Sequence, residues 1–181
     1  MSLLHSLLPA RRRPHERAGF QLYAAAVAAA RNPVFYADLG VPDTVDGRFD
    51  LVTLFAALVV ERLRGSPEPG PALAQAVFDA MFSDMDKSLR EMGVGDLSVG
   101  KRVRAMWEAF HGRALAYSAA LTAGDEQALA AGLQRNVWRG KTVPDGSAAR
   151  LSRHALRVHA DLAGQTMQVL SEGKIHFLPP E

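Results

Sequence analysis

The chain has 181 residues, of which 48% are hydrophobic and 22% are charged, and its formal net charge is +2. This length fits one globular domain, and the composition is ordinary for a soluble fold. There is no cysteine, which excludes disulfides and thiolate metal sites. The longest apolar run, residues 51–60, is far shorter than the ~18 residues that a membrane-spanning helix needs.

Charge is unevenly distributed along the chain. Residues 1–31 hold five basic and one acidic residue, residues 32–96 hold five and eleven, and residues 97–181 hold eleven and seven. The three segments therefore carry net charges of +4, −6 and +4. We expect part of this charge to cancel inside the fold, and the remainder to influence the choice of partner and the rate of association.

The first 13 residues are interpreted as a flexible basic tail. Four leucines precede the arginines at 11–13, which is the reverse of the order in a secretory signal. The segment fits a solvated tail, and it also fits a short amphipathic turn with a basic collar. Leu3–Arg13 is therefore a candidate for peripheral contact with an anionic membrane.

The first half of the chain predicts two helices before a proline- and glycine-rich linker. One helix begins at Pro14 and ends at Arg31, just before Asn32-Pro33. After a loop at 35–49, a second helix is expected over 51–64, capped by Asp50. Apolar residues surround nearly the whole circumference of this second helix, which indicates a central, buried element.

Two longer helices joined by a glycine turn form the centre of the predicted fold. Apolar residues recur at spacings of three and four over 73–92 and again over 99–117, so each helix has one apolar stripe. Gly93 suits the left-handed position after the first helix, and Asp96 or Ser98 is expected to cap the second. The expected result is an antiparallel hairpin with facing stripes.

Two more helices are expected over 126–138 and 148–171, followed by an extended tail over 174–181. Their predicted inward residues are Leu129, Leu133 and Val137 in the first, and Leu151, Ala155, Val158, Leu162 and Val169 in the second. No segment favours a strand. The sequence thus predicts an all-α, single-domain bundle of about six helices around a central antiparallel helical hairpin.

The residues give no pattern for catalysis, a metal or a cofactor. Residues 95–101 spell G-x-x-x-x-G-K, but Arg102 stands where a phosphate-binding loop needs Ser or Thr, and a helix rather than a strand precedes it. His154 and His159 are five residues apart and so lie on different helix faces. We therefore expect no catalytic, cofactor-binding or metal-binding residue and no small-molecule substrate.

Eight residues of the hairpin are candidates for binding a partner. They are Met81, Met85, Met92, Lys101, Arg102, Arg104, Met106 and Trp107. Flexible thioethers suit a surface that accepts apolar partners of variable shape, but they also fill cores, so their exposure decides between the two interpretations. Trp107 lies one residue off the apolar stripe, which fits packing in the core and also fits the rim of a partner interface.

The three basic candidates lie near the start of their helix, where positive charge opposes the helix dipole. Acidic residues that could offset them are Asp84, Asp86 and Glu91 on the preceding helix. We expect at least one arginine to be paired internally and the others to form a basic patch, although a solvated helix face is also compatible with this pattern.

Several segments resemble the ubiquinol–cytochrome c chaperone family. The main one is residues 82–96, continued by V-G-K-R-V at 99–103; the others are residues 35–50, F-H-G-R at 110–113 and R-N-V-W-R-G at 135–140. The resemblance covers about residues 14–175, which defines a chaperone-like domain between tails at 1–13 and 176–181.

The resemblance implies an all-helical, non-enzymatic assembly factor for the cytochrome bc complex. Its implied partner is newly made cytochrome b, or another apolar subunit, together with a small helper protein and the ribosome. The implied location is the cytoplasm, at the inner face of the membrane, or the mitochondrial matrix in a eukaryote. The alternative from the residues alone is an RNA- or ribosome-associated helical module whose basic patches bind phosphate, with affinity that falls steeply with salt.

Overall fold

The computed structural model describes residues 15–139 and 141–181, and over these ranges it contains helices and no strand. The elements in chain order are α1 (Glu16–Ala30), α2 (Pro33–Ala37), α3 (Val45–Arg64), α4 (Gly70–Glu91), α5 (Asp96–Ala123), α6 (Glu126–Leu133), the π-helical segment η1 (Gln134–Trp138), α7 (Ser147–Gly164) and α8 (Met167–Ser171). The prediction of an all-α fold is confirmed. The short helices α2 and α8 were not expected.

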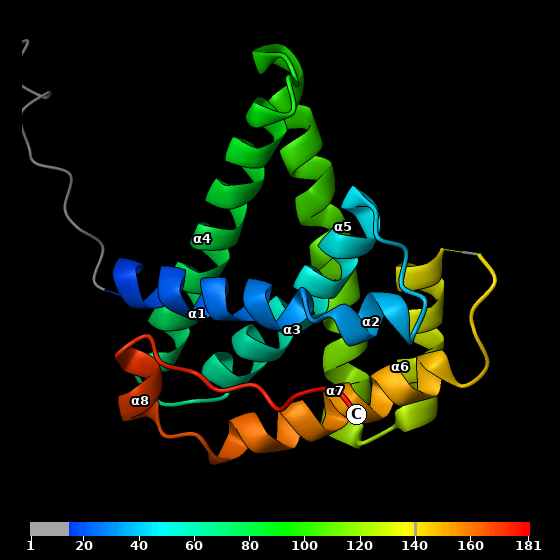
Figure 1. The fold of residues 1–181 in the computed structure, drawn as a ribbon. Coiled ribbons are helices and arrows are strands. Elements are labelled where there is room, and N and C mark those ends of the chain that lie inside the picture. Colours follow the sequence, from blue (N-terminus) through cyan, green and yellow to red (C-terminus); the bar gives the residue numbers. More distant parts are fainter. Residues whose placement is uncertain (1–14, 140) are drawn as a thin grey trace, which may run out of the picture.

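The predicted hairpin exists, but its two helices diverge. α4 and α5 meet at the turn between them and spread apart like the legs of a letter A, while α1 crosses the lower part of α4 (Figure 1). Gly19 allows α1 to approach α4 closely, because a Cβ at this position would lie 2.5 Å from the Cβ of Ala76. The apolar face of α4 therefore packs against α1 and α3 as well as against α5.

Three aromatic rings join the two diverging helices lower down. The ring of Phe110 on α5 lies 5.7 Å from that of Phe78 and 6.5 Å from that of Phe82, both on α4. The expectation of facing stripes is thus met at this cluster and not along the whole hairpin.

The turn between α4 and α5 is held by glycine and by an arginine. Gly93 has a φ of 79°, which confirms the predicted left-handed position. Gly95 is the N-cap of α5 and no side chain caps that helix, so the predicted capping by Asp96 or Ser98 is wrong. The Asp96 carboxylate instead accepts a hydrogen bond from Arg90, whose Nε also donates to Asp86 at 2.7 Å. Arg90 therefore ties the end of α4 to the start of α5.

The central helix α3 is buried as predicted, but it begins earlier than expected. Thr44 caps it, with its hydroxyl oxygen accepting from the Gly47 amide at 3.2 Å. Asp50 consequently lies inside the helix and is fully buried. The prediction that Asp50 caps α3 is wrong because a capping threonine precedes it.

The predicted last helix is two helices in the structure. Gln165 adopts extended backbone with ψ 131°, and Thr166 caps α8. Arg62 of α3 donates to the carbonyl oxygens of Leu162 at 2.7 Å and of Gln165 at 2.6 Å, so a distant side chain satisfies the end of α7. Val169, predicted to face inward, is 40% exposed as a result.

The other inward-facing residues predicted for the C-terminal third are buried. The last turns of the predicted helix at 126–138 are π-helical and form η1. Residues 174–181 have no regular structure, and Phe177 packs on Phe55 with ring centroids 5.5 Å apart. None of the helices in the described ranges combines the length and apolarity needed to cross a bilayer.

His154 is a buried histidine of α7, and neither of its ring nitrogens has a hydrogen-bond partner among residues 15–139 and 141–181. Its ring lies 5.5 Å from that of Phe35 and 6.1 Å from that of Phe55. Burial, with a smaller contribution from the positive charge of Arg157, lowers its pKa to about 4. The folded protein therefore holds this imidazole neutral.

This histidine predicts acid sensitivity. The unfolded chain takes up a proton at His154 near the ordinary pKa of 6.5, whereas the folded chain does so only at about 4. The associated stability is complete above pH 6.5 and is lost as the pH falls to about 4, by up to about 3 kcal/mol. Urea unfolding should show that the free energy of unfolding of His154→Leu changes less with pH over this range than that of the wild type. His159→Leu, on the same helix, should keep the wild-type slope; equal slopes for all three proteins would contradict the assignment.

Candidate functional site: a groove between α4 and α5

A groove of about 850 Å³ lies between the two diverging helices. Its sides are residues of α4 and α5, and its base is formed by α1, the start of α3 and the end of η1. Figure 1 shows the arrangement of the elements that supply these residues, with α4 and α5 as the two legs and α1 crossing them. The volume lies in the upper part of the ~300–1,000 Å³ range of ligand sites.

Much of the groove surface is apolar. Its apolar lining consists of Met85 and Leu89 from α4, Met92 at the C-cap of α4, Ala105, Met106 and Ala109 from α5, and Val45, Phe49 and Val52 from α3. Met92 is 52% exposed and Met106 is half-buried, whereas Met85 is buried in the wall. Exposed thioethers and small alanines give a surface that can adjust to apolar side chains of different shapes.

The structure brings four of the eight predicted partner-binding residues into this groove: Met85, Met92, Arg102 and Met106. Met81 is only 1% exposed and packs in the core, so it offers no surface to a partner. Lys101, Arg104 and Trp107 do not line the groove. Trp107 is 41% exposed rather than packed in the core, and it stacks on His111 with the ring planes 7° apart.

The predicted internal pairing of an arginine is confirmed, but its partner differs from those expected. Arg104 pairs with Glu108 of the same helix, with Nε to Oε1 at 3.1 Å. The acids of α4 have other partners: Asp84 accepts from the Tyr23 hydroxyl at 2.8 Å, and Glu91 lies 3.7 Å from Lys87. Within the described ranges, no ion pair involves Lys101 or Arg102.

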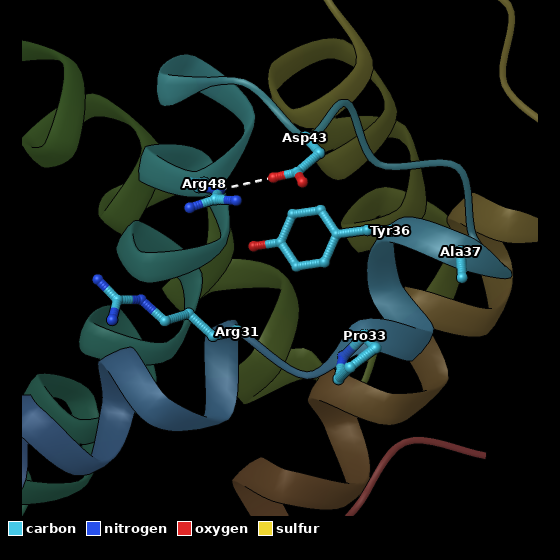
Figure 2. Close-up of a pocket in the computed structure, with 6 residues that line it drawn as sticks. All are labelled: Arg31, Pro33, Tyr36, Ala37, Asp43 and Arg48. Atoms are coloured by element: carbon cyan, nitrogen blue, oxygen red, sulfur yellow. Dashed lines mark hydrogen bonds and ion pairs between the residues drawn. The ribbon is translucent and has the colours of Figure 1, made fainter.

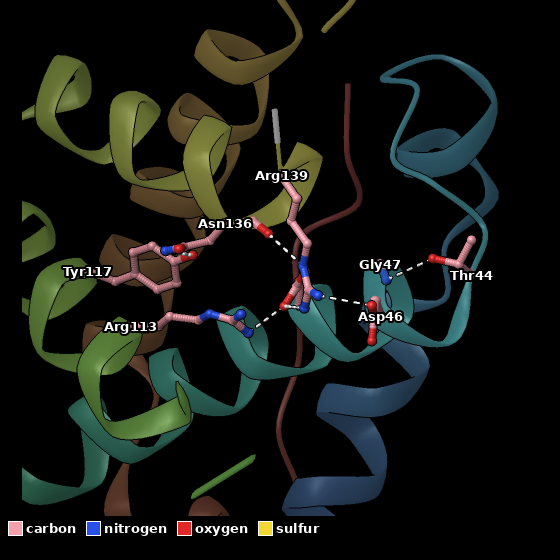
Figure 3. A network of polar contacts seen from close by, with 8 residues as sticks. Thr44, Asp46, Gly47, Arg113, Tyr117, Asn136 and Arg139 are labelled. Atoms are coloured by element: carbon pink, nitrogen blue, oxygen red, sulfur yellow. Dashed lines mark hydrogen bonds and ion pairs between the residues drawn. The ribbon is translucent and has the colours of Figure 1, made fainter. Parts of the chain in front are cut away.

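A buried carboxylate clamp closes the base of the groove. Asp50 accepts hydrogen bonds from Arg113 of α5 and from Arg139 at the end of η1, whose Nε and Nη2 lie 2.9 and 3.1 Å from the carboxylate oxygens. Arg139 also donates to Asp46 at 2.9 Å. Figure 3 shows both arginines reaching towards the start of α3. Three segments far apart in sequence are therefore held together by one carboxylate.

Burial dominates the electrostatics of this clamp. Desolvation raises the pKa of Asp50, and the two arginines oppose this shift only in part. Arg139 has a φ of 48°, a left-handed conformation that is uncommon outside glycine and is fixed here by its bonds to Asp50 and Asp46. One signal for these arginines was visible in the sequence, since Arg113 ends the segment F-H-G-R and Arg139 lies in R-N-V-W-R-G.

A second hollow, of about 540 Å³, adjoins the groove beside α2. Arg31, Tyr36, Asp43 and Arg48 lie around it, together with Pro33 and Ala37 (Figure 2). The Tyr36 hydroxyl donates to the Ala30 carbonyl at 3.0 Å, and Arg48 pairs with Asp43 at 2.6 Å. Because Arg31 and Arg48 line both hollows, they mark the point where the groove continues towards α2.

Comparison with known proteins identifies the family. The family described as ubiquinol-cytochrome C chaperone matches residues 37–177. A ubiquinol-cytochrome-c reductase complex assembly factor 1 of Xenopus laevis is 22% identical over 120 residues, which are 66% of this chain and 60% of that protein's length. The crystal structure of the Cbp3 homolog from Brucella abortus superposes with a TM-score of 0.81 at 38% identity, covering 91% of both chains.

These matches agree with the resemblance in the hairpin and in the two arginine-bearing segments. The family model includes most of the groove residues, the Asp50 clamp and all of α7, and the superposition extends over nearly the whole fold. This chain belongs to the ubiquinol-cytochrome C chaperone family.

Proposed function

We propose that this chain is a non-enzymatic assembly chaperone of the ubiquinol–cytochrome c reductase complex, and that its groove holds an apolar segment of newly made cytochrome b. Family membership supports the role in assembly. The observation that carries the site is the open groove, whose apolar lining includes the exposed Met92 and the half-buried Met106.

The groove suits a client that must be shielded for a limited time. Covering apolar surface contributes about 25 cal/mol per Å², so a segment that buries one face there gains affinity without any covalent chemistry. Thioether side chains can repack around different apolar residues. The chaperone would thus act stoichiometrically and release its client when partner subunits cover the same face.

Deletion of the gene provides the test of this function. Cells that lack the protein should contain less assembled cytochrome bc complex, and newly made cytochrome b should copurify with the tagged wild-type protein. The measurements are the haem spectrum of membranes and capture of pulse-labelled cytochrome b. Normal levels of the complex in the deletion strain would contradict the proposal.

Three further contacts remain predictions. A small helper protein and the ribosome are expected partners, and the expected location is at the inner face of the membrane. The candidate membrane segment Leu3–Arg13 lies outside the described residues. The alternative of an RNA-binding module is not favoured by the family match, and client capture that persists at high salt would separate the two.

A further inference from the structure

The two long walls of the groove carry opposite charge. On the α4 wall the charged residues are Asp84 and Glu91, and both are acidic. On the α5 wall they are Arg102 and Arg113, and both are basic. Between them lie the apolar residues, with Arg31, Asp46, Arg48 and Arg139 at the base, so the two long walls of the groove differ in charge.

Two of these charges are available to a ligand. Arg113 is held by Asp50 and Asp84 accepts from Tyr23. Arg102 is exposed and has no ion pair within the part of the chain that the structure describes. Over the same described residues, Glu91 has one ion pair, the exposed contact with Lys87 at 3.7 Å, which contributes little. Among the wall residues, Arg102 and Glu91 are therefore the charges that an incoming segment meets, and Arg31 and Arg48 add positive charge at the base.

The shape of the site fits one face of an amphipathic helix. Such a helix lays its apolar residues into a groove and leaves two polar flanks along the rims. If the helix is reversed in the groove while its apolar face stays down, its N- and C-terminal ends change places. The flank that faced the α4 wall then faces the α5 wall. A groove with one acidic and one basic wall therefore distinguishes the two directions whenever the flanks of the helix differ in charge.

We propose that the groove binds an amphipathic helix with an acidic and a basic flank, and that the opposite charges of its walls set the N-to-C direction in which the helix lies. This inference rests on the proposed function, since it takes the groove as the client site. The acidic flank lies along Arg102 and the basic flank lies along Glu91. Direction matters for a chaperone because it fixes which end of a bound segment is presented to the next factor.

The probe is a pair of designed helical peptides with the same apolar face. One carries glutamates on the first flank and lysines on the second, and the other has the two flanks exchanged; each has one cysteine at its N-terminus. Because the protein has no cysteine, single variants can report direction by disulfide formation. Ser98→Cys places a thiol towards the α4–α5 turn, and Val45→Cys places one at the base of the groove.

We expect each peptide to link with a roughly tenfold preference for one of the two positions, and the two peptides to prefer opposite positions. Arg102→Glu combined with Glu91→Lys should reverse both preferences. Arg104→Glu combined with Glu108→Lys, which also exchanges two charges but outside the groove, should change neither. At 1 M salt the preference should disappear while the peptides still bind, because screening removes the charge contribution and leaves the apolar one.

Three outcomes would overturn the inference. If both peptides bind but link equally to both positions, or keep their preference in the Arg102/Glu91 variant, the walls do not set direction, and the groove remains a candidate client site. If neither peptide binds, the groove is not a site for amphipathic helices. None of these results depends on the deletion test, which decides the role in assembly separately.

Discussion

Replacing Asp50 with alanine should lower the free energy of unfolding by about 3–5 kcal/mol, because it leaves the half-buried Arg113 and the more exposed Arg139 without their shared, buried partner. The carboxylate is fully buried and bonds to Arg113 and Arg139, whose side chains are 16% and 40% exposed. Removing it breaks the link between α3, α5 and η1 at once. Urea unfolding followed by circular dichroism measures the loss.

Asp43→Ala is the matched control for this substitution. Asp43 also pairs with an arginine, Arg48, but both side chains are 58% exposed and solvent screens the pair. Its unfolding midpoint should stay close to that of the wild type. If Asp50→Ala were as stable as Asp43→Ala, the clamp would not hold the three segments together.

Replacing Ala105 with tryptophan should weaken capture of cytochrome b at least tenfold. Ala105 is exposed and lines the groove on α5, so a large ring there fills space that an apolar client segment would occupy. A tenfold loss corresponds to about 1.4 kcal/mol, which is modest compared with burial of one large apolar side chain. Copurification of pulse-labelled cytochrome b with the tagged variant gives the measurement.

Ala119→Trp on the same helix separates this effect from general damage. Ala119 is also exposed but does not line the groove, so this variant should capture the client as the wild type does. Both proteins should unfold at the same urea concentration. Equal capture by the two variants would place the client elsewhere on the surface, and reduced capture by both would point to a loss of fold.

The sequence predicted the parts of the fold that depend on local patterns. The hairpin, the buried circumference of α3 and the left-handed Gly93 all follow from residue spacing or from single-residue backbone preference. The methionines of α4 and α5 were also identified, but not their separation into core and surface. Which methionines are buried depends on where α1 and α3 pack, and the spacing of apolar residues does not predict those positions.

The parts that were missed depend on distant contacts. Asp50 looks like a helix cap in the sequence, and its partners Arg113 and Arg139 lie 63 and 89 residues away. The break between α7 and α8 involves Arg62, about a hundred residues earlier. The groove exists because α4 and α5 diverge. Two apolar stripes predict that the helices pack against each other, but they do not predict the angle between them.

Side-chain contacts hold α4 and α5 in their diverging arrangement at three places. Arg90 fixes the turn, Tyr23 ties α4 to α1 through Asp84, and Arg113 ties α5 to α3. These contacts preorganise the groove before a ligand binds, so the protein loses little conformational entropy on binding. Release of a bound segment would then require a competitor for the same apolar surface, and it would require no hinge motion of the chaperone.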